Sequence, residues 1–395
     1  MSALGRHPSR AAAADRFRQD HEVGAARREV AGLYEVRQLM LEAAKRSDDV
    51  RDAVPEPARP VVVNDDAVRL ALAQHLSRIS GSRTEIVSFG RKSSGFSWIT
   101  YAFVARSAAE ADRKLILRVG PPNGLFAPYS VLPQVYALQA LANSGVPVPA
   151  LVSSEQDGAE IGFPFFICAH VEGDVPAPWA ASELDADHRR AIARQFLEIL
   201  ASLHRIDPGA TPFTSLQQGE QRAELRAISG WRASLARPTA RYYPLLDWGG
   251  RWLHDNCPQP LRRTIVHGDY RIGNFIEHNG RIASILDWEL THLGDPHEDL
   301  AWAMMPTFNA RSRKLYGVLE RAEVVDLYQR ASGIAVSDKS LAFYEAHALY
   351  QAAAIQMCAV RAFEVDRFND MRLAVMASQM PSIVRAFERA LEAAA

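Results

Sequence analysis

The feature that most constrains the fold is a change in the spacing of apolar residues near Gly173. Before this point, apolar and polar residues alternate in strand-length runs at 85–89, 98–105, 114–119 and 163–171, with a helical pattern at 132–142. After it, apolar residues recur at helical spacing, above all from residue 323 onwards. The order predicts an α+β protein with an antiparallel N-lobe sheet carrying one helix and a mainly helical C-lobe. A ligand is expected between the two lobes.

Three regions follow from this change and from the residues that precede the strands. Residues 1–60 are predicted to form an N-terminal helical arm and linker, because a helical pattern at 25–45 runs into the charged, proline-containing stretch 47–60. Residues 61–173 would form the N-lobe and residues 174–395 the C-lobe. The arm is expected to pack on the body or on a second copy of the chain, so a homodimer is one expectation.

Composition narrows the partners and the compartment. Among 395 residues the formal net charge is −1, which gives no electrostatic reason to expect nucleic acid or an anionic membrane as partner. No uninterrupted apolar run approaches the roughly 20 residues that span a bilayer. The 3 cysteines form no CxxC pair, so we expect neither a zinc site nor a disulfide framework. We therefore expect a cytoplasmic protein.

The richest chemistry lies in VHGDYRIGNFI at 266–276 and ILDWE at 285–289. Phosphoryl transfer needs a group that takes the acceptor's proton, metal ions that neutralise the phosphates, and in-line positioning. Asp269 can accept a hydroxyl proton, while Asn274 and Asp287 offer the hard oxygen ligands that Mg²⁺ prefers. His267 is expected to hold the loop by hydrogen bonds. The combination predicts a magnesium-dependent kinase centre.

The segments HGDYRIGN and ILDWELTHLGDPHEDLAW resemble the aminoglycoside phosphotransferase and choline kinase-like superfamily, over about residues 80 to 385. They are most similar to the phosphotransferase modules associated with acyl-CoA dehydrogenases. The resemblance implies a protein-kinase-like bilobal fold, with Asp269 as catalytic base and Asn274 and Asp287 as metal ligands. It makes Asp295 and Asp299 structural, joining the loop after Asp287 to the next helix.

The same resemblance assigns the nucleotide side of the N-lobe. In SSGFSWITY, Gly95 would allow the backbone to approach a phosphate and Ser97 would bind it. Arg118 stands where related kinases place a phosphate-binding lysine. Gln134 stands where they place the glutamate that holds this lysine, and it can accept one hydrogen bond without balancing the charge of Arg118.

The segment PFFICAHVEG resembles the hinge of this superfamily, where backbone groups around Ala169 and His170 would meet the base. Such contacts do not separate ATP from GTP, so either nucleotide fits. For Arg271 and Glu289 we expect a local ion pair, with contact to the acceptor as the alternative. For His347 and Tyr350 we expect a buried helix stripe, with a place in the acceptor pocket as the alternative.

The acceptor is open at this point. The resemblance favours a hydroxylated acyl chain or its CoA thioester, with an aminoglycoside or amino-alcohol as the alternative. A cationic acceptor would need several carboxylates to converge in the C-lobe, and the candidates are Glu320, Glu323, Asp326 and Glu345. A non-catalytic nucleotide-binding protein is a third hypothesis, because Arg118 and Gln134 replace the usual ion pair.

Overall fold

The computed structural model describes residues 63–92, 97–108, 111–178, 184–216, 222–237, 239, 241–366 and 370–395. The chain divides into two compact units. The described helices and strands lie in the unit made of residues 56–237 and 245–395, apart from Pro244 at the start of one helix. The predicted arm and linker, residues 1–60, and Gly95 lie outside the described residues. The lobe boundaries at 61–173 and 174–395 therefore stay predictions.

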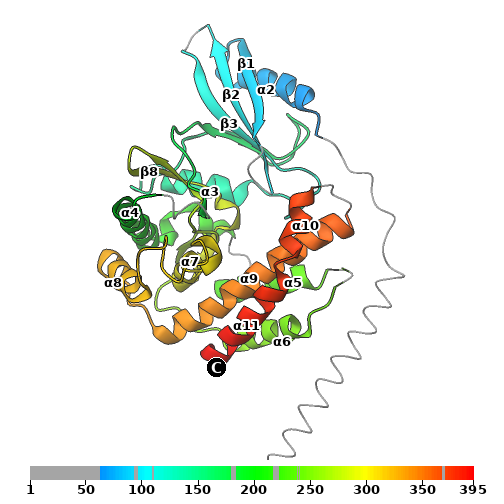
Figure 1. Ribbon diagram of the computed structural model, residues 1–395. Helices are drawn as coiled ribbons and strands as arrows, with labels where there is room; N and C mark the ends of the chain where they lie inside the picture. Colours follow the sequence, from blue (N-terminus) through cyan, green and yellow to red (C-terminus); the bar gives the residue numbers. More distant parts are fainter. Residues whose placement is uncertain are drawn as a thin grey trace, which may run out of the picture. The chain divides into compact units, whose positions relative to one another are not determined.

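The N-lobe contains one five-stranded antiparallel sheet in the order β1-β2-β3-β5-β4 (Figure 1). Its strands are β1 (Thr84–Lys92), β2 (Ile99–Ser107), β3 (Arg113–Val119), β4 (Leu151–Glu155) and β5 (Phe165–Ala169). Four of them match the alternating runs in the sequence. β4 was not predicted, because its residues are half-buried and show no alternation of apolar and polar side chains.

Helix α2 (Asp65–Ser80) covers one face of this sheet (Figure 1). Asn64 caps this helix, because its side chain accepts a hydrogen bond from the Ala67 amide at 3.0 Å. Val68, Leu72 and Leu76 are buried one turn apart and pack against inward-facing residues of β2 and β3. Helix α3 (Leu132–Leu141) is the one helix inserted between β3 and β4.

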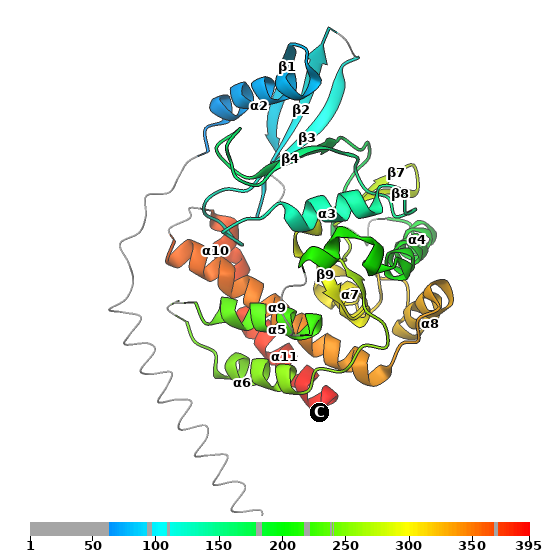
Figure 2. The ribbon, with the colours of Figure 1, turned by 180° about the vertical axis from the view of Figure 1, so that it is seen from behind.

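Helices make up most of the C-lobe (Figure 2). They are α4 (Ala186–Arg205), α5 (Ala223–Leu235), α6 (Pro244–Asp255), α7 (His297–Ala303), α8 (Arg321–Ser332), α9 (Asp338–Glu364), α10 (Met371–Ala377) and α11 (Met380–Ala394). α9 packs against α5, α7, α10 and α11 and forms the centre of the lobe. Among the described helices, none has the length and apolarity that a bilayer crossing requires. The fold is thus the predicted α+β arrangement.

Two small sheets hold the loops that carry the polar motifs at 266–276 and 285–289. β6 (Thr264–Val266) pairs with β9 (His292–Gly294), and β7 (Phe275–His278) pairs with β8 (Arg281–Ile285). The short apolar runs at 264–266 and 282–286 predict strands, and β6 and β8 lie at these positions. Their partner strands β7 and β9 were not predicted, because segments of 4 and 3 residues are too short to show a period of apolar residues.

In the sequence, Ser182 followed three residues later by Asp185 resembles a capping box, which predicts that a helix starts there. Asp185 itself is the N-cap, because its carboxylate accepts hydrogen bonds from the Asp187 and His188 amides at 2.9 and 3.0 Å. Ser182 lies outside the described residues. An acidic side chain satisfies the free amides of a first turn as well as a serine does, so the sequence placed the start of the helix too early.

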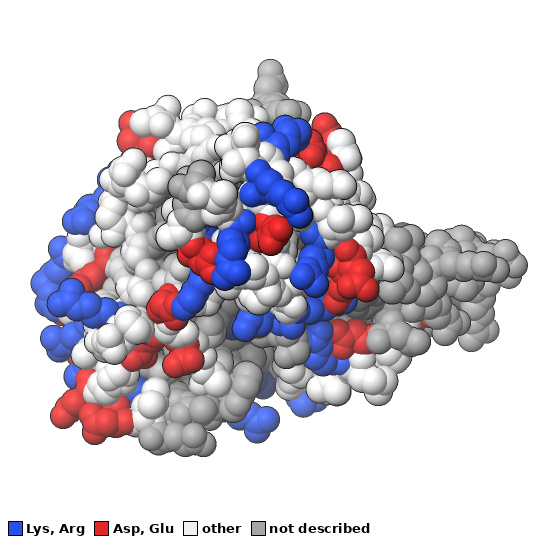
Figure 3. Space-filling view, turned by 90° about the horizontal axis from the view of Figure 1, so that it is seen from above, with Lys and Arg blue, Asp and Glu red and all other residues white. Residues whose placement is uncertain are grey.

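Figure 3 looks onto the N-lobe end and shows Lys and Arg side chains beside Asp and Glu. Exposed ion pairs on the sheet include Arg106–Asp112 at 2.7 Å and Arg83–Glu85 at 3.2 Å. Charges of both signs are therefore interspersed over the strands.

Candidate active site

The catalytic-loop candidate begins where β6 ends and is held from beneath by Asp299, at the start of α7. The fully buried Asp299 carboxylate accepts hydrogen bonds from the amides of His267 and Gly268 at 2.7 and 2.9 Å. His204 lies 3.2 Å from the same carboxylate. Burial opposes the charge of Asp299, but these hydrogen bonds and the nearby imidazoles outweigh burial and lower its pKa. Asp299 ties the loop at 267–268 to α7, whereas the sequence predicted that it would tie the loop after Asp287.

Gly268 is a position where the backbone requires glycine. Its φ is +81°, and a Cβ there would lie 2.5 Å from the Leu290 carbonyl oxygen. The Gly268 carbonyl accepts a hydrogen bond from the Gln351 side chain of α9 at 2.8 Å. The loop is thus fixed on both sides by groups from distant parts of the chain.

His267 is fully buried within the loop. Its Nδ1 accepts the Asp269 amide at 3.1 Å, which leaves Nε2–H to donate to the Leu286 carbonyl at 2.8 Å. These two bonds define the neutral imidazole tautomer. His267 therefore links the backbone before Asp269 to the segment before Asp287, and its part is positional.

The Asp269 carboxylate receives three donated hydrogen bonds. Oδ1 accepts from Trp302 Nε1 at 2.7 Å and from Arg271 Nε at 3.0 Å, and Oδ2 accepts from Asn274 Nδ2 at 2.6 Å. A carboxylate offers about four acceptor positions, so one position on Oδ2 remains open. That position can receive the proton of an incoming hydroxyl, and the other three bonds fix its direction. Trp302 was not identified from the sequence.

Asn274 and Asp287 each keep one oxygen free among the described residues. Asn274 donates two hydrogen bonds through Nδ2, to the carbonyl and the carboxylate of Asp269, so its Oδ1 is available. Asp287 binds Arg118 through Oδ1 and leaves Oδ2 available. The Leu286 amide donates to the Asn274 carbonyl at 2.9 Å, which brings the two segments together. An amide oxygen and a carboxylate oxygen facing one cavity fit a magnesium ion.

Asp287 has a left-handed backbone, with φ 60° and ψ 57°, at the end of β8. Few residues other than glycine adopt this conformation, and aspartate is among those that do so most often. Burial opposes its charge, but Arg118, at 2.7 Å, and the more distant Arg271 outweigh burial and lower the pKa of Asp287. The carboxylate is therefore ionised and ready to bind a cation.

Arg118 on β3 joins the N-lobe to the C-lobe through this ion pair. The hydrogen bond that Gln134 was predicted to accept is absent among the described residues, because Arg118 donates to Asp287 instead. Gln134 is buried, and its Nε2 has no partner. An ionised carboxylate outcompetes a neutral amide for a guanidinium, which explains the difference.

One cavity lies on each side of the catalytic loop. The first cavity has a volume of about 460 Å³ and lies between the lobes. Arg118, Gln134 and Lys92 line it from the N-lobe, and Asn274 and Asp287 line it from the C-lobe. Its apolar walls include Ile116, Leu138, Phe166, Ile276, Ile285 and Leu286. Cations and metal-ligand oxygens at one part and apolar walls at another suit a nucleoside triphosphate.

The predicted hinge residues Ala169 and His170 both line this cavity. Their amides are already engaged, with the Ala150 carbonyl at 2.9 Å and the Lys114 carbonyl at 3.1 Å respectively. Val171 also lines the cavity and follows the end of β5. Its amide is the next backbone donor along the hinge, and no sequence signal distinguishes it from its neighbours. Cys168 is buried there, and burial raises the pKa of its thiol to about 11.

Ser97 and Glu289 connect the phosphate-loop candidate with the segment after Asp287. The Ser97 hydroxyl lies 2.8 Å from each Glu289 carboxylate oxygen. The expected ion pair between Arg271 and Glu289 is wrong, because Arg271 binds Asp269 and stacks over the Phe308 ring at 5.1 Å. Burial, together with the charge of Asp287, raises the pKa of Glu289 to about 7.

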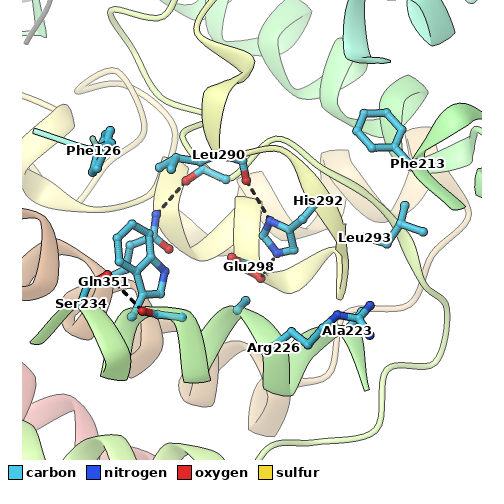
Figure 4. Close-up of a pocket in the computed structure, with 14 residues that line it drawn as sticks. Phe126, Phe213, Ala223, Arg226, Ser234, Leu290, His292, Leu293, Glu298 and Gln351 are labelled. Atoms are coloured by element: carbon cyan, nitrogen blue, oxygen red, sulfur yellow. Dashed lines mark hydrogen bonds and ion pairs between the residues drawn. The ribbon is translucent and has the colours of Figure 1, made fainter. Parts of the chain in front are cut away.

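The second cavity, of about 440 Å³, lies on the C-lobe side of the loop (Figure 4). Gly268 and Leu290 form part of its wall, so the catalytic loop borders both cavities. The remaining wall is largely apolar and comes mainly from α5 and β9, with single residues from α7, α9 and two further segments. It includes Phe126, Phe213, Ala223, Ala227, Gly230, Trp231 and Leu293.

One ion pair, His292–Glu298, lies in the wall of the second cavity (Figure 4). His292 Nε2 is 3.3 Å from Glu298 Oε2, and Nδ1 is 2.9 Å from the Leu290 carbonyl. Burial lowers the pKa of His292, but the charge and hydrogen bond of Glu298 outweigh it and raise this pKa to about 9. Glu298 Oε1 is buried and has no hydrogen-bond partner within the part of the chain that the structure describes.

The acidic residues proposed for a cationic acceptor do not line this cavity. Each pairs with a basic side chain elsewhere: Glu320 with Lys314, Glu323 with Arg190, Asp326 with Arg330, and Glu345 with Arg321. His347 and Tyr350 are both 1% exposed, which confirms the buried stripe of α9. Gln351, next to them, reaches the cavity instead.

Curated relatives of this chain carry acyl-CoA dehydrogenase names. It is 31% identical over 199 residues to acyl-CoA dehydrogenase family member 10 of Mus musculus, which covers 49% of this chain and 18% of that protein. It is 26% identical over 276 residues to family member 11 of Homo sapiens, which covers 67% of this chain and 35% of that protein. The chain spans well under half of the relatives' length.

Solved structures share the fold at low sequence identity. A Ralstonia eutropha protein classed with the aminoglycoside phosphotransferases has a TM-score of 0.65 and 22% identity, covering 82% of this chain and 98% of that one. A choline/ethanolamine kinase family protein of Mesorhizobium loti has a TM-score of 0.53 and 17% identity, covering 84% and 99%.

The family of this chain follows from a match between its sequence and a family model. The model of the phosphotransferase enzyme family matches residues 93–334, a stretch that contains the catalytic loop, Arg118 and both cavities' main walls. The two-lobed fold and the arrangement around Asp269 agree with that match. This chain belongs to the phosphotransferase enzyme family.

Proposed function

We propose that the chain transfers the terminal phosphate of ATP to a hydroxyl group of a small molecule. The observation that carries this proposal is that one loop, residues 267–274, borders two cavities of different chemistry. The cavity between the lobes offers cations and metal-ligand oxygens for a nucleotide. The cavity beneath offers an apolar wall for an acceptor. Asp269 belongs to the loop between them.

In this mechanism Asp269 takes the proton of the acceptor hydroxyl at the open position of Oδ2. Trp302, Arg271 and Asn274 hold the carboxylate while the oxygen attacks the phosphorus. Arg118 leaves Asp287 and binds phosphate oxygens, since a guanidinium matches two such oxygens well. The bond to the leaving diphosphate breaks as the new phosphoester bond forms.

Asn274 Oδ1 and Asp287 Oδ2 are proposed to hold magnesium, which when bound neutralises the charge of the phosphates. The nucleotide base would lie between Leu138, Ile276 and Ile285, with the Val171 amide as a hinge donor. Backbone contacts of this kind accept adenine or guanine, so GTP is proposed as a second donor. The proposed roles of Ser97 and Gly95 in the phosphate loop stay predictions.

We propose a hydroxylated acyl chain, or its CoA thioester, as the acceptor. The apolar wall of the second cavity supports this choice, as do relatives that carry acyl-CoA dehydrogenase names. An aminoglycoside is disfavoured, because the cavity wall has one carboxylate, Glu298, already paired with His292. Polycationic ligands need several unpaired carboxylates.

The test is a screen for acceptor-dependent ATP consumption with magnesium present. Hydroxyacyl-CoA thioesters, amino-alcohols and aminoglycosides are the three acceptor groups, and the unhydroxylated acyl-CoAs are the matched controls. The proposal expects stimulation by the hydroxyacyl thioesters alone. Stimulation by aminoglycosides alone would refute the acceptor class. Tight ATP binding with no stimulation by any acceptor would support the non-catalytic hypothesis instead.

A further inference from the structure

Helix α5 presents a face of small residues to the second cavity. Ala223, Ala227, Gly230 and Ser234 all line it. At about 100° per residue, these four positions fall within one narrow arc of the helix. Gly230 lies at one edge of this arc, between Ala223 and Arg226, and both of these neighbours also line the cavity, so a side chain at position 230 would point into the cavity.

Nothing in the packing of α5 requires glycine at position 230. Its φ is not in the left-handed region, and a Cβ built on it meets no atom within 4 Å. Gly249 and Gly250 on α6 differ, because a Cβ there would lie 2.5 Å from Phe387 and 2.2 Å from the Tyr350 hydroxyl. A helix-interior glycine costs about 0.5–1 kcal/mol relative to alanine. At position 230 no packing contact requires the glycine, and the missing side chain leaves open space in the cavity.

The cavity beside Gly230 has the size and lining of a site for an apolar chain. Trp231 packs edge-on against Phe126, with ring centroids 6.4 Å apart, and Phe213, Leu290 and Leu293 add further apolar wall. Its volume of about 440 Å³ is roughly fifteen times that of one liquid water, enough for a chain of several carbons. The unpartnered Oε1 of the nearly buried Glu298 adds one hydrogen-bond acceptor for a polar group of the ligand.

We propose that Gly230 sets the length of the acyl chain that the acceptor cavity admits, with the chain running along the small-residue face of α5. This inference rests on the proposed function, because it assigns the acceptor of that reaction to the second cavity. Gly230 is then a specificity-determining residue that contacts the acceptor chain and takes no part in proton transfer.

The test compares Gly230→Leu with the unchanged protein on hydroxybutyryl-, hydroxyhexanoyl- and hydroxydecanoyl-CoA. Leucine would fill the space beside Trp231, so KM for the hydroxydecanoyl thioester should rise by about tenfold or more, the loss of some 1.4 kcal/mol of binding. KM for the hydroxybutyryl thioester and KM for ATP should stay within about twofold. Ala233→Leu is the matched control, since Ala233 is exposed on the same helix and does not line the cavity.

Calorimetric titration of hydroxydecanoyl-CoA into the nucleotide-free protein supplies a readout independent of turnover. Thermal unfolding with and without ATP checks that Gly230→Leu is folded and still binds nucleotide. An active unchanged protein whose chain-length profile is the same in Gly230→Leu would overturn the inference and leave the proposed function standing. A protein that phosphorylates no hydroxylated acceptor would sink both. Loss of long-chain binding in Gly230→Leu, with Ala233→Leu unaffected, would support the inference.

Discussion

At the scale of single residues, the site depends on how the Asp269 carboxylate is oriented. Three donors fill three of its four acceptor positions, and one of them, Trp302, comes from α7. The indole N–H therefore acts through Asp269 and not on the acceptor itself.

Trp302→Phe should lower kcat by about tenfold, because one hydrogen bond to a charged group is worth roughly 1.5 kcal/mol. KM for ATP should be unchanged, since Trp302 does not line the nucleotide cavity. Steady-state kinetics with a saturating acceptor measures both. Trp252→Phe is the control, because Trp252 stacks on Phe343 away from the loop, at 6.1 Å. A raised KM for ATP with unchanged kcat would contradict the positioning role.

The His292–Glu298 pair predicts a pH dependence of stability. The pKa of His292 is raised to about 9 in the folded protein, against its usual value near 6.5. Its stabilisation is therefore complete below about pH 6.5 and is lost as the pH rises through about 9. The melting temperature should fall over this window, and His292→Gln should flatten that fall. Calorimetric scans at several pH values check it; an equal fall in both proteins would contradict the assignment.

Residue identities in the site were largely predictable from the sequence, and their partners were not. His267, Asp269, Asn274 and Asp287 lie in two short motifs, so local spacing identifies them. The bonds from Trp302 to Asp269 and from Arg118 to Asp287 join residues 33 and 169 positions apart. Which distant group reaches a carboxylate depends on tertiary packing, and spacing along the chain carries no information about it.

At the scale of elements, close helix packing in the C-lobe depends on glycines of α6. Gly249 lies against the fully buried Phe387 ring of α11. Gly249 is therefore tightly packed, whereas Gly230 on α5 borders open space.

Gly249→Ala should destabilise the protein by about 1–3 kcal/mol, because overpacking against Phe387 exceeds the gain in helix propensity. Gly230→Ala should stabilise it by about 0.5–1 kcal/mol, since the added methyl meets nothing. Chemical denaturation of both variants measures the two changes. Equal effects of the same sign would show that helix propensity alone governs both sites.

Elements with a long apolar period were predicted, whereas the short strands β4, β7 and β9 were missed. α2, β1, β2, β3 and α9 have several turns or alternations of buried residues. β9 has three residues and owes its existence to pairing with β6. A segment of that length has no period of its own, so only its partner makes it a strand.

At the scale of the whole molecule, the ion pair Arg118–Asp287 connects the sheet with the catalytic segment. In the proposed mechanism, a bound nucleotide exchanges this pair for phosphate and metal contacts. The acceptor cavity, by contrast, was beyond sequence reasoning, because its wall comes from α5, β9 and loops far apart in the chain.

Arg118→Gln should weaken ATP binding by about tenfold or more, since a charge-assisted bond to phosphate is lost. Binding of hydroxydecanoyl-CoA to the nucleotide-free protein should be unchanged. Arg106→Gln is the control, because Arg106 is in an exposed ion pair on β2 with the same 2.7 Å separation. Unaltered ATP affinity in Arg118→Gln, measured by calorimetry, would count against its phosphate role.

The central claim is that Asp269 takes the proton of a hydroxyl group while the terminal phosphate of ATP is transferred. The most direct measurement is the transfer of labelled terminal phosphate from ATP to a hydroxyacyl-CoA by the unchanged protein and by Asp269→Asn, with ATP affinity measured in both. The account predicts that Asp269→Asn loses about 10²–10⁴ in rate and binds ATP normally. Phosphate transfer at an undiminished rate in Asp269→Asn would contradict it.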